Sequence, residues 1–381
     1  MKKQIVLATI ATLATSSAWA TKSRMNALGQ YQDRGSFYIQ DTRNVFRNAA
    51  RINQTNNYMV TEWGDATAAG GASNPKAEGG FFKNSGSFNY GVYLGSDIGD
   101  FDGLTEGYAG TTITSPGTFK ARSNDLDLFF GGDMGVEWGA RLHYANGKEE
   151  GTFEKKQNTL GLGLGMVMGD LNAYVNYTIN SEHEGAGEAG DKLEDDGSMN
   201  VGVGYKWMDY TFFVDYNKGA AKLTDADTAA NNLETDQSVL NVGAGYIKEV
   251  SSTSRMFADI AFRMTSQEDK GNGSTTERDY NELPLTVGFE TDATSWLTLR
   301  GSISQNIILN SVKTKTTGAA EVKSTRDNTT SVQAGATLNF GKLMIDGMIG
   351  TNGNDGTAGS GNGGVLDTDR LLTQVAVHYW F

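Results

Sequence analysis

Over most of its length the chain alternates between apolar and polar residues. The clearest window is 171–180, where odd positions are Leu, Ala, Val, Tyr and Ile and even positions are Asn, Tyr and Thr. The same period of two recurs at 136–144, 256–264 and 283–289. Helical spacing fits none of these windows, because it would mix both parities on each face. The pattern therefore predicts β-strands with one apolar and one polar face.

Short and long connections alternate between these segments. Short ones lie at 169–170, 208–209, 341–342 and near 132–133, with longer ones at 248–254 and 292–295; long polar ones lie at 98–123, 147–157, 181–197, 219–236, 266–281, 308–328 and 352–370. Outer-membrane barrels show this asymmetry, with short periplasmic turns and long extracellular loops. Fourteen strands fit between residues 88 and 381, and two more candidates lie at 57–64 and 77–83. The predicted fold is all-β: a closed antiparallel transmembrane β-barrel of about 16 strands, with 14 as the alternative.

The first twenty residues have the features of a secretory signal peptide. Two lysines at positions 2 and 3 precede an apolar run over 5–14, and Ala18-Trp19-Ala20 fits a small-x-small cleavage site. The apolar run is shorter than the roughly 20 residues that a membrane-spanning helix needs. We expect residues 1–20 to be a cleaved signal peptide, 21–56 an N-terminal periplasmic or lumenal plug segment, and 57–381 the barrel.

Composition excludes several classes of function. The 381 residues include no cysteine, which rules out a disulfide framework, a thiolate metal site and a cysteine nucleophile. The formal net charge is −13, and the basic residues form no stripe, so nucleic acid is a poor partner. Only three prolines but 49 glycines are present. Seven of these glycines lie on the polar parity of strands, where they would widen the lumen or let a plug lie against the wall: Gly161, Gly163, Gly165, Gly202, Gly204, Gly243 and Gly245.

Aromatic residues on the apolar parity gather near the expected strand ends. Tyr205, Trp207 and Tyr210 flank a short turn, whereas Tyr144 and Tyr177 lie near long loops. Tyr and Trp prefer membrane interfaces because their rings are apolar and their tips are polar. The distribution predicts two aromatic girdles.

The chain ends in an alternating segment, 371–381, that closes on Phe381. This end resembles the C-terminal strand by which Gram-negative outer-membrane proteins are recognised by the barrel-assembly machinery. With the leader and the repeated hairpins, the mature chain resembles porin-like outer-membrane proteins. Residues 24–28 and 38–48 also look like the N-terminal region of porin-like major outer-membrane proteins of predatory delta-type bacteria. The resemblance implies an outer-membrane location and a homo-oligomer, most often a trimer.

The segment before the barrel carries three basic residues, Arg43, Arg47 and Arg51, that would face the lumen or the periplasm. Long-chain fatty-acid transporters have an N-terminal plug with an Asn-Pro-Ala motif, and here Asn48-Ala49-Ala50 stands at a similar place without the proline. Asp41 is positioned to cap a short helix running to Asn48. A lumenal plug and a periplasmic extension that seals the rim both fit these residues.

Polar-parity charges of both signs predict a lining for a water-filled pore: Glu137, Arg141, His143, Asp215, Asp259, Arg263, Glu290 and Arg300. Such a lining suits hydrated solutes and suits a fatty-acid tunnel badly, because charges buried beside an alkyl chain are costly. His143 shares its face with Glu137 and Arg141, but a pore-lining role is favoured over acid–base catalysis. The acidic loop 181–197, which includes His183, reads as a solvated face, so we expect no metal and no cofactor.

The sequence therefore predicts a porin that passes small hydrophilic solutes and ions by passive diffusion. The alternative is a structural or surface-interaction barrel with a plugged lumen. A hydrophobic-substrate transporter and a barrel enzyme are less favoured, and we expect no enzymatic activity. Expected partners are outer-membrane lipid, lipopolysaccharide, small solutes and the barrel-assembly machinery.

Overall fold

The structure is a computed structural model of the chain and describes residues 21–55, 57–63, 77–96, 119–120, 122, 124–186, 188–326, 329–351 and 371–381. The signal-peptide prediction, most of loop 98–123 and loop 352–370 lie outside the described residues. No helix among the described residues is long and apolar enough to cross a membrane.

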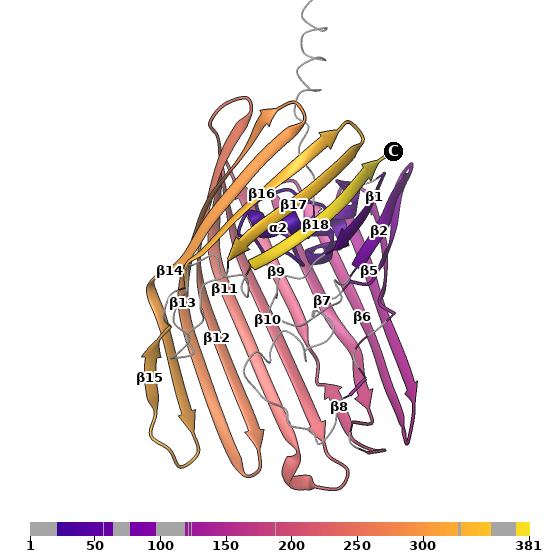
Figure 1. The fold of residues 1–381 in the computed structure, drawn as a ribbon, viewed down its shortest axis with the longest axis vertical. Coiled ribbons are helices and arrows are strands. Elements are labelled where there is room, and N and C mark those ends of the chain that lie inside the picture. Colours follow the sequence, from indigo (N-terminus) through magenta and orange to yellow (C-terminus); the bar gives the residue numbers. More distant parts are fainter. Residues whose placement is uncertain are drawn as a thin grey trace, which may run out of the picture.

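Sixteen antiparallel strands form the wall of a closed barrel (Figure 1). They are β1 (Tyr58–Trp63), β2 (Ala77–Ser85), β3 (Phe88–Leu94), β4 (Leu126–Asp133), β5 (Glu137–Glu150), β6 (Glu154–Met168), β7 (Leu171–Glu184), β9 (Met199–Trp207), β10 (Tyr210–Thr224), β11 (Leu233–Glu249), β12 (Ser254–Gly271), β13 (Ser274–Thr294), β14 (Leu297–Thr316), β16 (Ser331–Phe340), β17 (Leu343–Thr351) and β18 (Leu371–Trp380). The first and last strands pair along 58–63 and 375–380 and close the cylinder. The prediction of about 16 strands is confirmed, including the two N-terminal candidates.

Two short strands lie outside this regular wall. β8 (Lys192–Asp195) pairs with the far ends of β7 and β10, and β15 (Val322–Thr325) extends a hairpin from β14. A single 3-10 turn, η3 (Ala229–Asn231), joins β10 to β11. These elements belong to the end of the barrel opposite the C-terminus (Figure 1).

The two faces of the wall have opposite character, and the apolar face is the outer one. On β7, Val175 and Ile179 are 37% and 51% exposed, whereas Asn176 and Thr178 are buried. The predicted girdle residues Tyr205, Trp207 and Tyr210 are also exposed on the outside. Soluble proteins bury such side chains, but a barrel in lipid presents them to hydrocarbon.

The wall is much taller on one side than on the other (Figure 1). β12, β13 and β14 have 18, 21 and 20 residues, whereas β1 and β3 have six and seven. A strand needs only about 9–11 residues to cross a bilayer. The tall strands therefore continue well beyond any membrane they cross.

This height corrects part of the loop prediction. Segments 147–157 and 266–281 are largely strand, and 219–236 is strand at both of its ends. β12 turns into β13 through only Asn272 and Gly273, both with positive φ. Backbone pairing continues after the side-chain alternation ends, because outside the bilayer neither face has to be apolar. Polarity on both faces therefore marked the end of the membrane contact and not the end of the strand.

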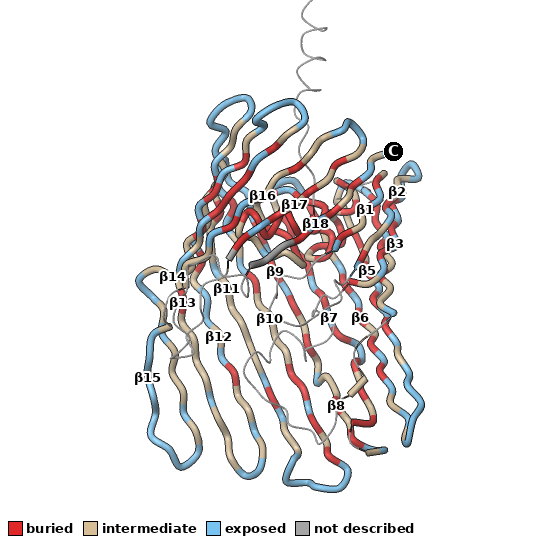
Figure 2. Tube along the Cα trace, in the orientation of Figure 1, coloured by how far each residue is buried: buried red, intermediate tan, exposed pale blue. Residues whose placement is uncertain are grey.

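The N-terminal segment, residues 21–55, contacts the polar inner face of the wall. It contains α2 (Lys22–Ala27), α3 (Asn44–Arg47) and the 3-10 helix η1 (Ala49–Asn53). α2 contacts β14, β16, β17 and β18, and η1 contacts β3 to β6. Buried residues concentrate in this half of the barrel, near the short turns and the C-terminus (Figure 2).

Candidate functional site

The first helix is tied to the wall by a buried ion-pair cluster. The guanidinium of Arg24 is fully buried and lies 2.8 Å from the Asp41 carboxylate and 2.8 Å from that of Glu290. Glu290 also contacts Arg255 and Arg300, and Arg300 lies 3.1 Å from Asp346. Each guanidinium is therefore held by carboxylates, which buried charges require. The predicted pore-lining residues Glu290 and Arg300 are thus part of the contact with the N-terminal segment.

Local sequence positions Arg24 in this cluster. Thr21 caps α2 by accepting a hydrogen bond from the Arg24 amide, at 3.3 Å, and its hydroxyl donates to Asp346 at 3.2 Å. Burial raises the pKa of the Asp41 carboxyl, while the charge of Arg24 acts in the opposite direction. Asp41 accepts the Arg43 amide at 2.8 Å, and the helix that follows covers only Asn44–Arg47, so it is shorter than predicted.

Arg43 anchors the segment to the first three strands of the wall. Its Nη1 lies 3.0 Å from Glu78, 3.3 Å from Glu62 and 2.9 Å from the Tyr93 hydroxyl. Lys22 lies 3.1 Å from the same Glu78. Burial alone would lower the pKa of the Lys22 ammonium, but Glu78 and Asp33 more than offset it and raise the pKa to about 12.

The other two predicted plug arginines have different partners. Arg47 lies 3.2 Å from Asp215 on β10 and stacks over the Phe37 ring at 4.4 Å. Arg51 donates to Gln54 at 2.6 Å, and Gln54 in turn donates to Glu137 at 2.6 Å. Arg43 and Arg47 therefore contact wall carboxylates directly, whereas Arg51 reaches Glu137 through a neighbour.

Wall glycines make room for the N-terminal segment. A Cβ on Gly139 would lie 2.2 Å from the backbone carbonyl carbon of Ala49, and one on Gly245 would lie 2.3 Å from the Tyr38 ring. Gly165 and Gly204, two more of the glycines singled out in the sequence, lie against Asn48 and Phe37. These approaches require glycine, because no side chain fits between the wall and the segment.

Arg141 and His143 are lumen-facing but out of reach of solvent. Both are buried, and both contact Asp127, at 2.7 Å and 3.0 Å. The Ser96 hydroxyl also donates to Asp127. In a nucleophile–base–acid relay the hydroxyl bonds the imidazole and the carboxylate lies behind it. Here the carboxylate lies between the hydroxyl and the imidazole, so the three groups do not have the order of that relay.

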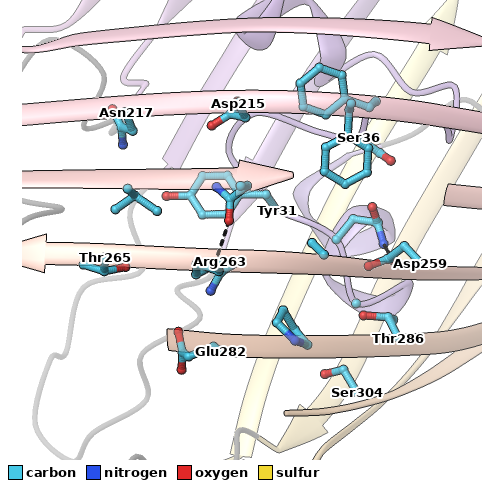
Figure 3. A pocket seen from close by; sticks show the side chains of 18 of the residues that line it. Tyr31, Ser36, Asp215, Asn217, Asp259, Arg263, Thr265, Glu282, Thr286 and Ser304 are labelled. Carbon is cyan, nitrogen blue, oxygen red and sulfur yellow. Dashed lines mark hydrogen bonds between the residues drawn. The ribbon is translucent and has the colours of Figure 1, made fainter. Parts of the chain in front are cut away.

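Beyond the N-terminal segment, the lumen contains a cavity of about 900 Å³. Residues 29–31 and 34–38, with Arg47, form one side of it. Strands β10 to β14, with Arg326 and Thr329, form the rest. Asp215, Asp259 and Arg263 line it, so three of the eight predicted pore-lining residues are brought together here (Figure 3). Asp259 accepts hydrogen bonds from the Tyr38 hydroxyl at 2.6 Å and from Gln30 at 2.9 Å.

At the far end of the barrel, His183 is buried, so at this position segment 181–197 is not the solvated face that the sequence predicted. Its Nδ1 lies 2.9 Å from the Lys120 carbonyl oxygen. A different group, Glu188, Asp191 and Asp225, places carboxylate oxygens within 4.8 Å of one another and could supply oxygen ligands to a divalent cation. No local pattern in the chain marks this group, because Asp225 comes from another hairpin.

Comparisons with known proteins give structural neighbours only. No family model matches the chain, and no curated protein matches it in sequence. A mutant of the Rh. blastica porin is 9% identical, covers 85% of this chain and 99% of its own, and has a TM-score of 0.31. The Ralstonia pickettii toluene transporter TbuX is 12% identical over 96% and 99% of the two chains, with a TM-score of 0.39. The Pseudomonas putida toluene transporter TodX is 11% identical over 95% and 97%, with a TM-score of 0.37.

Proposed function

We propose that this protein is an outer-membrane channel for small hydrophilic solutes, and that the N-terminal segment restricts its lumen. One observation carries the proposal: a polar cavity of about 900 Å³ lies inside a closed wall whose outer face is apolar. Water and hydrated solutes fit a lining of charges and amides, whereas alkyl chains do not. The same argument stands against a hydrophobic-substrate transporter.

The N-terminal segment is the proposed restriction, with its boundaries at residues 21–56. Arg24, Arg43 and Arg47 each contact wall carboxylates, and these four carboxylates lie on four different strands of the cylinder. Removing one partner from a buried ion pair leaves an uncompensated charge, which is strongly unfavourable. The segment is therefore expected to stay in place during passage of solutes.

Conductance tests the proposal. The full chain, refolded into planar lipid bilayers, is expected to show small, stable single-channel steps, and a variant lacking residues 21–55 is expected to show larger ones. Lys148→Gln is the control, because Lys148 lies in an exposed ion pair with Glu150 and neither residue lines the cavity. An electrically silent bilayer with both the full chain and the deletion variant would contradict a channel function.

The alternative is a structural or surface-interaction barrel with a sealed lumen. The observation in its favour is the number of buried ion pairs that hold the N-terminal segment in place. In that case the full chain would be silent and only the deletion variant would conduct. This outcome would support the N-terminal segment as a plug and would contradict the function as a solute channel.

Location and assembly form part of the same proposal. The expected signal peptide and the alternating C-terminal strand ending at Phe381 favour export and recognition by the barrel-assembly machinery. The outer face favours contact with lipid, and the acidic far end favours divalent ions bridged to lipopolysaccharide. A homo-oligomer and the absence of enzymatic activity remain expectations, testable by mass analysis in detergent and by hydrolase assays.

A further inference from the structure

Most charges that line the cavity are already matched. Arg47 lies 3.2 Å from Asp215, and Arg326 lies 3.1 Å from Glu282. Arg34 is only 5% exposed and lies mostly beneath the surface of the cavity. Matched pairs attract a passing ion weakly, because their fields largely cancel beyond a few ångströms.

Asp259 and Arg263 on β12 are different. The donors to Asp259 are the neutral Tyr38 hydroxyl and Gln30 amide. Arg263 donates from Nε to the neutral Asn241 side chain at 3.0 Å, which leaves the terminal nitrogens of its guanidinium toward the cavity. Neither residue forms an ion pair with any residue that the structure describes. Glu282 stands opposite Arg263 in the β12–β13 register, but its carboxylate contacts Arg326 at 3.1 Å. Among the described residues that line the cavity, Asp259 and Arg263 are therefore the charges left for a solute.

The two charges lie on one face of one strand. They are four positions apart in the chain, so their Cα atoms are about 13 Å apart at the usual rise per residue of a strand. Between them lies Ala261, paired across the sheet with Gly243, and Pro284 lines the cavity on the neighbouring strand. Along this face of β12 the wall therefore has an acid, the small side chain of Ala261, and then a base. Figure 3 labels the acid, Asp259, and the base, Arg263.

We propose that this face of the cavity binds dipolar solutes, small molecules with an ammonium group at one end and a carboxylate at the other. The ammonium group lies at Asp259, and the carboxylate takes the guanidinium fork of Arg263. A simple anion at Arg263 would be repelled by Asp259, and a simple cation at Asp259 would be repelled by Arg263, whereas a dipolar solute meets two attractions. The inference rests on the proposed function in taking the cavity as the entrance through which solutes pass.

Equilibrium binding to the full chain in detergent tests this, with 6-aminohexanoate as the probe. Hexanoate and hexylammonium are the singly charged controls, and glycine is the short dipolar control. We expect 6-aminohexanoate to bind about tenfold more tightly than each of the other three probes. One added charge-assisted contact gives a ratio of this size. Equal binding of all four probes would overturn the inference without any variant being made.

Two substitutions locate the contacts. Asp259→Asn and Arg263→Gln are each expected to remove the roughly tenfold advantage of 6-aminohexanoate, because each deletes one of the two charge-assisted contacts. Arg278→Gln is the matched control: Arg278 lies further along the same hairpin and already contacts Asp269, so the advantage should persist. An advantage that survives both test substitutions would place the binding elsewhere and overturn the inference.

Current through single channels separates this inference from the proposed function. If 6-aminohexanoate blocks the single-channel current of the full chain, and Asp259→Asn and Arg263→Gln each weaken this block, both the channel function and the dipolar site are supported. Conduction without preferential binding removes the dipolar site and leaves the channel. Preferential binding in detergent with a silent bilayer supports the site and removes the channel.

Discussion

Arg24 and Glu290 lie 266 positions apart in the chain and form a two-point ion pair. Arg24 Nε is 2.8 Å from Oε2, and Nη2 is 3.1 Å from Oε1. This fork geometry is the strongest form of contact between arginine and carboxylate. It joins α2 to β13 and fixes the depth of the N-terminal segment in the barrel.

Arg24→Gln should loosen the N-terminal segment. The substitution leaves Asp41 with one partner fewer and weakens the compensation of Glu290, and loss of one member of a buried pair costs about 3–5 kcal/mol. Limited proteolysis should then cut within residues 21–55, and single-channel steps should become larger. Lys148→Gln, in an exposed pair with Glu150, is the control and should change neither readout. Protease resistance equal to that of the parent chain would contradict the anchoring role.

Gly139→Ala should displace the same segment by steric contact alone. The new Cβ would lie 2.2 Å from the carbonyl carbon of Ala49, so either the backbone of η1 or the wall must shift. We expect faster proteolytic cleavage of residues 21–55, which gel analysis measures. The barrel should stay folded, which circular dichroism checks. Gly347→Ala is the matched control, because its nearest neighbour would be 3.9 Å away. Identical cleavage rates for the two variants would show that Gly139 is not needed for close approach.

The outer face of β12 should reject charge. Ile260→Arg would place a guanidinium in lipid and destabilise the barrel by about 2–4 kcal/mol near the membrane midplane. Thr265→Arg, on the cavity side of the same strand, should fold normally because the cavity is polar. Folding yield into lipid vesicles and urea unfolding provide the measurements. Equal stability of the two variants would mean that the faces are assigned wrongly.

Phe381 has a packing role in addition to its expected recognition role. Its ring stacks on Phe81 with centroids 5.4 Å apart, and its amide donates to the Asn57 carbonyl at 3.0 Å. Phe381→Ala should lower outer-membrane levels in cells severalfold but reduce refolding in detergent only slightly. Phe81→Ala removes the same stacking and serves as the comparison. Equal losses in cells for both variants would assign the defect to packing.

The sequence was sufficient for the wall because one physical constraint acts on it residue by residue. Lipid requires an apolar side chain at every second position, and 171–180 shows this directly. The same constraint predicted the inward glycines, and Gly165, Gly204 and Gly245 do lie against the N-terminal segment. Outside the membrane this constraint no longer acts, and the prediction failed there. Segment 266–281 was predicted to be a loop, but most of it is strand although neither face is apolar.

The lumenal contacts could not be predicted in the same way. Parity showed that Arg141 and Asp259 point inward, but burial depends on what covers them. Arg141 lies beneath Phe46, whereas Asp259 reaches the cavity. Arg24 and Glu290 are 266 positions apart, so no local pattern in the chain shows that they pair.

The first residues of the N-terminal segment also lie across the join between the first and last strands. The Lys22 amide donates to Glu62 on β1, and Thr21 and Asn26 donate to Asp346 on β17 and Gln374 on β18. The first and last strands pair over only six residues. Residues 21–26 bridge this junction from inside the barrel. Separating β1 from β18 would therefore also require breaking the contacts that these residues make with strands on both sides of the junction.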